Sequence, residues 1–472
     1  MHTRAKKMSC CKIPTMKTSP PPINQSAAPT RWRRTTLAMG IAIAFFCIAP
    51  QEVIAQIAFD REPISYSSAK TNDPIAKLQA RINEGKVELQ FDEEHGYLKS
   101  VLHELGISTS TQMLVFSKTS FQLRRISPWS PRALYFNDDN YIGWVTNGDV
   151  IEVSSVDPEQ GAIFYTLSQE KAERPRFVRD QGNCLTCHAS SRTQGVPGHL
   201  VRSVYPSASG QPHFGSGTFR INHESPLKQR WGGWYVTGTH GRQRHMGNTI
   251  ARQRNEPESL DTEKGANITD LSDLTRTHLY LSNHSDIVAL MVLEHQVDMH
   301  NFITFASYDT RLAMHHGAVI NRALERPDDY VSASTKRRIE SAADKLVNYM
   351  LFVDEAPLTD KIEGTSEFAK EFAALGPRDS QGRSLRQFDL ERRMFKYPCS
   401  YLIYSDAFRS LPARVKEVVY QKLWDILNAK DQNDAFAHLS SDDRKAIFEI
   451  LCETHSDLPD SWKTSSNRGG SK

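Results

Sequence analysis

A cysteine pair followed by a histidine, Cys184-Leu185-Thr186-Cys187-His188, constrains this 472-residue chain more than any other feature of its sequence. Two thiols separated by two residues match the spacing of the two vinyl groups of a haem, to which they add as thioethers. The next residue then lies under the macrocycle, where an imidazole can bind iron. The motif therefore predicts one covalent haem c, attached through Cys184 and Cys187, with His188 as proximal iron ligand.

Two other readings of this motif stay open. A thioredoxin-like redox pair begins a helix in a βαβ unit, but the polar stretch at 179–183 precedes this motif and no such unit is visible. A zinc site needs further ligands, which nearby histidines could supply.

A leader is predicted at residues 1–55. Basic residues precede a mostly apolar run, Leu37–Ala49, which Pro50 ends, and Val53 and Ala55 fit the −3 and −1 positions of a cleavage site. This pattern is typical of a secretory signal peptide. A spanning helix needs about 20 apolar residues, so an uncleaved anchor is the less favoured alternative. We expect the mature protein to be periplasmic or otherwise exported, which strengthens the haem interpretation because haem is attached after translocation.

The charge is unevenly distributed along the chain. The formal net charge is +3, but residues 1–55 hold eight of the 58 basic residues and one of the 55 acidic residues. The remainder has 50 basic and 54 acidic residues, a net charge of −4. Such a body has no broad basic surface for nucleic acid. Only one apolar run is long enough to consider as a span, so no multi-pass membrane domain is expected.

Changes in composition predict an α+β fold. We expect a β-rich N-terminal domain at 56–175, a glycine-rich haem c-binding segment at 176–255, a mainly α-helical C-terminal domain at 265–462 and a disordered tail at 463–472. Residues 182–247 alone hold 11 of the 25 glycines and six of the 17 histidines. So much glycine argues against long helices in that segment.

Apolar periodicity predicts the individual elements. Strands are expected at Met113–Phe116, Ala133–Phe136, Tyr141–Val145, Val150–Val153, Ile163–Leu167, Phe214–Ile221 and Trp231–Val236, with a hairpin at Asn147-Gly148. Helices are expected at Ile75–Ile82, His284–Glu325, Ser334–Phe352, Leu385–Phe395, Pro412–Leu427 and Ser440–Leu451.

The sixth iron ligand is left undecided by the sequence. Met246 is the first methionine after the motif, and His240 and His245 lie beside it; His199, His213 and His223 are further candidates. Methionine would raise the reduction potential, histidine would lower it, and an open position would permit catalysis. Each of these residues is individually more often a core or surface residue than a ligand.

A cluster on the long helix expected at 284–325 has two interpretations. Glu294, His295, Asp298 and His300, followed by His315 and His316, could hold a second metal. A solvated face with a few satisfied histidines is favoured because no Glu-x-x-His motif is present.

Two cysteines beyond the motif remain in the mature chain. Cys399 and Cys452 would either pair in an oxidising compartment or stay as free thiols.

Several stretches resemble one family of exported bacterial proteins. They are Phe177–Ser191, Val196–Gly198, Phe214–Phe219, Arg230–Gly241 and Tyr397–Tyr404. They are similar to large c-type cytochrome-domain proteins of uncharacterised function with one Cys-x-x-Cys-His site, over most of residues 90–460. The only functional residues that the resemblance implies are Cys184, Cys187 and His188.

These observations predict an exported monohaem c-type cytochrome that carries out one-electron transfer with soluble or peripheral redox partner proteins. A periplasmic haem c oxidoreductase is the first alternative, in which extra mass builds a substrate pocket and His240 or His245 acts as an acid or base. A non-enzymatic haem sensor or scaffold is the second.

Overall fold

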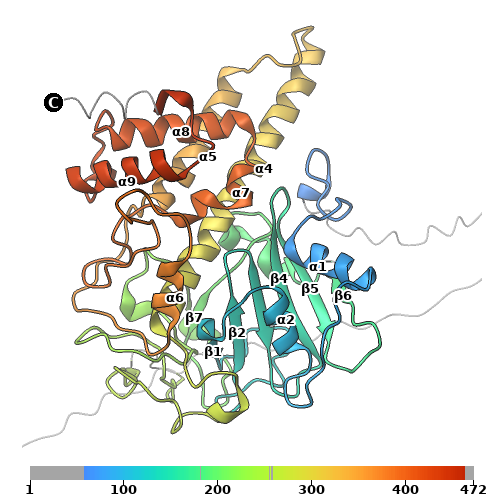
Figure 1. The fold of residues 1–472 in the computed structure, drawn as a ribbon, viewed down its shortest axis with the longest axis vertical. Helices are drawn as coiled ribbons and strands as arrows, with labels where there is room; N and C mark the ends of the chain where they lie inside the picture. Colours follow the sequence, from blue (N-terminus) through green and yellow to red (C-terminus); the bar gives the residue numbers. More distant parts are fainter. Residues whose placement is uncertain (1–57, 181, 255, 257–258, 463–472) are drawn as a thin grey trace, which may run out of the picture. The chain divides into compact units, whose positions relative to one another are not determined.

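The N-terminal half is built on a six-stranded antiparallel sheet whose spatial order follows the chain (Figure 1). The computed structural model describes residues 58–462 except 181, 255, 257 and 258, so the expected leader and tail lie outside the described residues. The strands are β1 (Met113–Val115), β2 (Arg132–Phe136), β3 (Asn140–Trp144), β4 (Val150–Asp157), β5 (Gly161–Ser168) and β6 (Phe177–Arg179). The five strands expected between residues 113 and 167 are thereby confirmed.

Turn chemistry sets the register of this sheet. The β3–β4 hairpin turns at Asn147, whose φ of 54° lies in the left-handed region that asparagine tolerates. The turn aligns Gly143 with Glu152 across the two strands. The β4–β5 turn is held by Asp157, whose Oδ1 accepts the backbone N–H groups of Glu159 and Gln160, both at 2.9 Å.

The two faces of the sheet pack against different elements, because successive side chains of a strand point to opposite sides. Tyr135, Ile142 and Val153 share a core with helices α1 (Pro74–Asn83) and α2 (Leu98–Glu104), which lie in front of the strands in Figure 1. On the other face, Phe136 and Val156 join the core that surrounds the long helix α4 (Ile287–Ala323).

The C-terminal half is mainly helical, which confirms the α+β class. Its longest element is α4 (Ile287–Ala323), beside which α5 and α8 are stacked (Figure 1). The remaining helices are α5 (Ala333–Met350), α6 (Phe368–Ala374), α7 (Asp406–Arg409), α8 (Ala413–Leu427) and α9 (Ser441–Thr454). Between the sheet and α4 in the chain come α3 (Leu185–His188), β7 (Arg202–Val204) and β8 (Thr218–Arg220).

The helix expected at Leu385–Phe395 is wrong. This segment is irregular, with Leu390 at a φ of 57° and a β-bridge between Phe388 and Phe395. Arg386 pairs with Asp138, and its guanidinium lies 4.2 Å from the centroid of the Tyr401 ring. These long-range contacts outweigh the local helical spacing.

The glycine-rich segment departs from expectation in a similar way. Trp231–Val236 is not a strand, because Trp231 and Gly233 have φ angles of 65° and 88° and only Trp234 bridges to Val115. Of Phe214–Ile221, only Thr218–Arg220 is a strand, and Phe214–Ser216 forms a 3-10 turn.

The expectations for cysteines and membrane spans have separate outcomes. Cys399 and Cys452 are both free thiols, which is the second of the two alternatives that the sequence left open. Within residues 58–462, apart from the four omitted positions, no helix combines the length and apolarity that crossing a bilayer requires.

Asp286 is fully buried and joins the start of α4 to the chain near residue 365. Its Oδ1 accepts the N–H groups of Val288 and Ala289 at 2.8 and 3.2 Å. Its Oδ2 accepts the N–H groups of Thr365 and Ser366, each at 2.8 Å. One carboxylate thus caps the long helix and closes a distant loop onto it.

We expect Asp286→Ala to lower the free energy of unfolding by about 3–5 kcal/mol, because it removes a cap and leaves buried N–H donors without acceptors. Ser332 caps only α5, so Ser332→Ala should cost about 1 kcal/mol. Urea denaturation of both variants measures the difference. Equal losses would show that Asp286 acts as an ordinary cap.

Candidate functional site

The motif cysteines lie on a single turn of backbone. The N–H groups of Cys187 and His188 donate to the carbonyl oxygen of Cys184 at 3.1 and 2.9 Å. Asp180 fixes the entry to this turn, because its Oδ2 accepts the N–H of Cys184 at 2.9 Å. Cys184 is half-buried, whereas Cys187 is exposed. One thiol therefore faces the protein and the other faces solvent.

The His188 ring is held in the orientation that a metal ligand needs. Its Nδ1 lies 2.9 Å from the carbonyl oxygen of Gly198, so Nδ1 carries the hydrogen and Nε2 keeps its lone pair. Nε2 has no hydrogen-bond partner within the part of the chain that the structure describes. Burial lowers the pKa of His188, which favours the neutral imidazole that binds iron. The ring centroid lies 4.8 Å from that of Phe164.

Gly198 connects this histidine to the protein core. A Cβ atom at this position would collide with Oδ1 of Asn301 on α4 and would lie 3.1 Å from Cβ of Thr193. Asn301 in turn accepts the N–H of His199 at 2.8 Å and donates to its carbonyl oxygen at 2.8 Å. The carbonyl group that positions His188 is therefore itself fixed by α4.

The surroundings of the motif fit a covalently attached porphyrin. Space beside the backbone is open, because a Cβ at Gly182, Gly195 or Gly217 would meet no atom within 4 Å. Two large apolar side chains on either side of the motif in the sequence are exposed: Val178 is 56% exposed and Phe214 is 60% exposed. A flat apolar group covering such side chains would be stabilised by their burial.

The structure gives the zinc alternative little support. Burial and the adjacent Asp180 and Glu152 carboxylates raise the pKa of Cys184 to about 12. Within the described ranges, the group of three potential ligand side chains brought together is Asp92, Glu94 and His95, which excludes the motif. No additional zinc ligands therefore converge on Cys184 and Cys187 there.

The three favoured candidates for the sixth ligand each form a hydrogen bond with another residue of the chain. The Met246 sulfur accepts a hydrogen bond from Ser203 at 3.6 Å. His240 donates from Nδ1 to the Gln243 carbonyl oxygen at 2.8 Å and accepts at Nε2 from the backbone of Asn267 at 3.0 Å. His245 accepts at Nδ1 from the Gly247 N–H at 3.0 Å. None of these contacts involves His188.

The other histidine candidates have different surroundings. His213 bonds to the Ala251 carbonyl oxygen at 3.1 Å, and His223 contacts His295. His199 contacts the same Phe164 ring as His188, with ring centroids 6.2 Å apart. Burial lowers the pKa of His199 well below its usual range, and His188 contributes to this shift. His199 is thus the candidate shown to lie close to His188.

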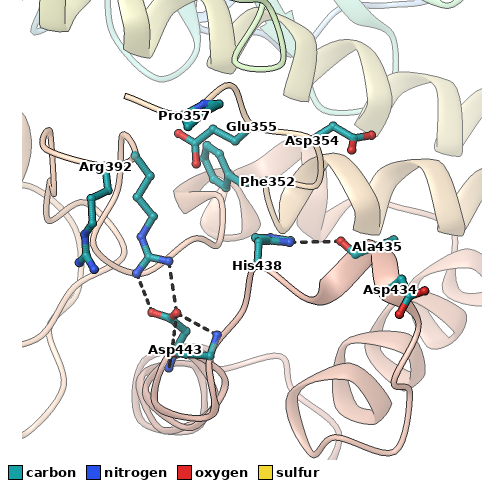
Figure 2. A pocket seen from close by; sticks show the side chains of 11 residues that line it. Phe352, Asp354, Glu355, Pro357, Arg392, Asp434, Ala435, His438 and Asp443 are labelled. Carbon is teal, nitrogen blue, oxygen red and sulfur yellow. Dashed lines mark hydrogen bonds and ion pairs between the residues drawn. The ribbon is translucent and has the colours of Figure 1, made fainter. Parts of the chain in front are cut away.

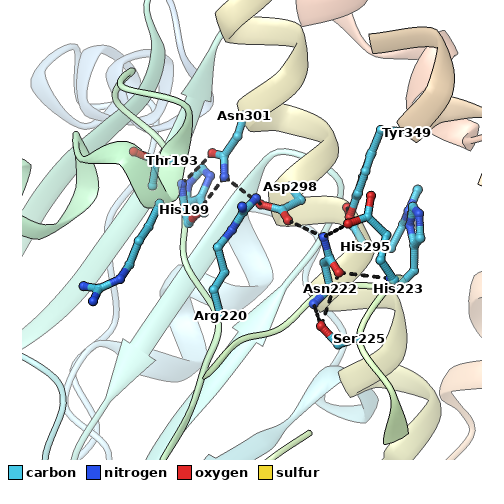
Figure 3. A network of polar contacts seen from close by, with 12 residues as sticks. Thr193, His199, Arg220, Asn222, His223, Ser225, His295, Asp298, Asn301 and Tyr349 are labelled. Atoms are coloured by element: carbon cyan, nitrogen blue, oxygen red, sulfur yellow. Dashed lines mark hydrogen bonds and ion pairs between the residues drawn. The ribbon is translucent and has the colours of Figure 1, made fainter. Parts of the chain in front are cut away.

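Most of the polar cluster on α4 is not a solvated face, which corrects the favoured interpretation for Glu294, His295, Asp298 and His300; His315 is half-buried and His316 is exposed. Glu294, His295, Asp298 and His300 are at most 2% exposed. Figure 3 shows how Asp298 links two arms of a buried network, by accepting hydrogen bonds from Asn301 and from Asn222, each at 3.0 Å. The helix passes through the core, so its polar side chains find partners inside the protein. The other interpretation of this cluster was a metal site. Among the described residues, its side chains do not come together as a set of metal ligands.

Two arginines neutralise carboxylates in this network, and the sequence pattern gave no sign of either. Arg220 on β8 pairs with Asp298, and Arg230 pairs with Glu294. Burial raises the pKa of Glu294, and Arg230 opposes that rise. His223 and His295 approach each other with their Nδ1 atoms 2.8 Å apart, and Ser400 lies 2.9 Å from His295 Nε2. In the sequence, the one signal for this buried network was the regular spacing of polar residues on the long helix.

Comparisons with known proteins give no relative of this chain: no family model, no curated protein and no solved structure matches it.

A pocket of about 640 Å³ lies in the helical half (Figure 2). Glu355 is on its wall, where Oε1 accepts the N–H of Met394 at 2.8 Å. Arg393 and Asp443 form an ion pair on the opposite side, at 2.6 Å. Burial raises the pKa of Glu355 to about 7. The pocket is separate from the motif, since it contains none of the motif residues.

The raised pKa of Glu355 predicts a pH dependence of stability. The folded protein holds this proton more tightly than the unfolded chain, so the contribution to stability is full below about pH 4.5, falls as the pH rises from about 4.5 to 7, and is lost above that. Glu355→Gln should therefore exceed the native protein in free energy of unfolding by about 2–3 kcal/mol at pH 8, and by little at pH 4. Denaturation across this range, with the exposed Glu340→Gln as control, measures the effect. Parallel pH profiles for native protein and Glu355→Gln would contradict it.

Proposed function

We propose that this protein is an exported monohaem c-type cytochrome whose function is one-electron transfer. The observation that carries the proposal is the His188 ring, anchored at Nδ1 by Gly198 and free at Nε2, directly after a cysteine pair on one turn. When bound, haem supplies an iron that cycles between Fe(II) and Fe(III).

The three side chains of the motif would each contribute to the binding of haem. Cys184 and Cys187 would hold it through two thioethers, and His188 would supply the axial nitrogen. The hydrogen bond to Gly198 orients the imidazole and raises its basicity as a ligand. The exposed position of Cys187 would leave one edge of the macrocycle accessible to a redox partner. Accessibility of an edge suits electron transfer more than chemistry on an enclosed substrate.

We expect the protein, when produced with haem-attachment machinery, to be coloured and to keep its pigment in acid–acetone. Replacing both Cys184 and Cys187 by serine should abolish covalent haem, whereas Cys452→Ser should not. His188→Ala should keep the thioethers but lose the native absorption spectrum, which added imidazole should restore. Absorption spectroscopy and intact mass measure these outcomes, with His315→Ala as the histidine control. A colourless native protein would refute the proposal.

A haem oxidoreductase is the second candidate, favoured by one observation. Met246, His240 and His245 all have other partners, so the sixth position could be open to an external ligand. Rapid binding of carbon monoxide to the reduced protein would support this candidate. A stable six-coordinate spectrum, unchanged by carbon monoxide, would support the electron carrier.

A further inference from the structure

The pocket of about 640 Å³ in the helical half has more acidic than basic side chains on its wall (Figure 2). Its volume lies within the range of about 300–1,000 Å³ that is typical of small-molecule sites. Its charged lining residues are two arginines and four acids: Arg392, Arg393, Asp354, Glu355, Asp434 and Asp443. Their formal charges sum to −2, so the pocket as a whole favours a positively charged occupant.

Every basic side chain on this wall already has another partner. Arg393 pairs with Asp443 at 2.6 Å, and Arg392 pairs with Asp389 at 3.0 Å. The two ring nitrogens of His438 lie 2.7 and 3.1 Å from backbone carbonyl oxygens. The remaining carboxylates of the pocket therefore have no ion-pair partner among its own described basic residues.

Glu355 is a partly buried carboxylate in this position. Its Oε1 accepts the N–H of Met394 at 2.8 Å, whereas its Oε2 has no hydrogen-bond partner among the residues that the structure describes. Burial raises its pKa most, Arg230 and Arg393 lower the pKa, and Asp389 raises it again, with a result of about 7. The charged form thus lacks contacts that would stabilise it, and a cation beside Oε2 would supply them.

The turn that carries Glu355 is fixed by buried rings. The Phe352 ring centroid lies 4.7 Å from that of His223 and 4.4 Å from that of His295. The N–H of Ala356 donates to the carbonyl oxygen of His223 at 3.0 Å. The carboxyl group of Glu355 is therefore positioned before a ligand arrives, which lowers the entropic cost of binding.

A metal ion is a less suitable occupant than an organic cation. A metal site needs several ligand atoms that converge on one point. Within the described ranges, the three potential ligand side chains that lie within reach of one another are Asp92, Glu94 and His95, and none of them lines this pocket. An organic cation can instead pair with a single carboxylate and fill the remaining volume with its carbon chain.

We propose that this pocket binds a small organic cation, whose ammonium or guanidinium group pairs with Glu355 and whose other end lies towards the exposed Asp354 and Asp434. Such a group donates charge-assisted hydrogen bonds to a carboxylate oxygen. The pocket contains none of the motif residues, so this binding does not depend on haem.

Isothermal titration calorimetry with agmatine tests the site. Agmatine carries one ammonium and one guanidinium group, which stay charged at both pH 5.5 and pH 8, as the side chains of lysine and arginine do. Native protein should bind it at pH 8, where Glu355 is ionised, and about tenfold or more weakly at pH 5.5, where Glu355 is protonated.

Two matched variants locate the binding. Glu355→Gln should bind agmatine at least about tenfold more weakly at pH 8 and should lose the pH dependence. This variant is expected to be more stable than the native protein at pH 8, so unfolding would not account for the loss. Glu340→Gln, at an exposed position on α5, should bind agmatine as the native protein does.

Three results would overturn the cation site. They are no binding of agmatine by the native protein at millimolar concentration, equal affinity of native protein and Glu355→Gln, or binding of the dianion glutarate in place of agmatine. The last result would mean that Arg392 and Arg393 hold an anion. A colourless protein that bound agmatine through Glu355 would refute the proposed cytochrome function and support this site.

Discussion

The structure depends on one constraint: α4 passes through the protein interior with polar side chains along its length, and each needs a partner there. An unsatisfied buried polar group costs about 1–3 kcal/mol. Gln296 donates to the carbonyl oxygen of Asn137 beside the sheet, at 2.8 Å, and Asn301 holds the motif segment at His199. His295 reaches Ser400 in the helical half. The buried helix therefore fixes the sheet, the motif segment and the C-terminal helices with respect to one another.

Local patterns predicted much of the fold. The strands between residues 113 and 168 and the helices α4, α5, α8 and α9 follow from apolar periodicity and turn residues, which act over short stretches of chain. Leu385–Phe395 failed because Arg386 is drawn to Asp138, some 250 residues away in the chain. The Trp231–Val236 strand failed because residues with positive φ interrupt it. Periodicity contains no information about either effect.

In the candidate site too, some features follow from local sequence and others depend on long-range contacts. Cys184, Cys187 and His188 are adjacent in the chain, so their spacing alone indicated their chemistry. The Gly198 carbonyl and the arginines that neutralise Asp298 and Glu294 come from segments that only the fold brings together. The same limit explains the solvated face expected on α4: polar spacing on a helix cannot distinguish water from buried partners.

Gly198 has two roles in the structure. Its carbonyl group sets the electron density of the His188 ring, and its missing side chain admits Asn301 of α4. Any larger residue would disturb both the orientation of the His188 ring and the interior packing in one step. The character of this imidazole therefore could not be adjusted through position 198 without also reshaping the centre of the molecule.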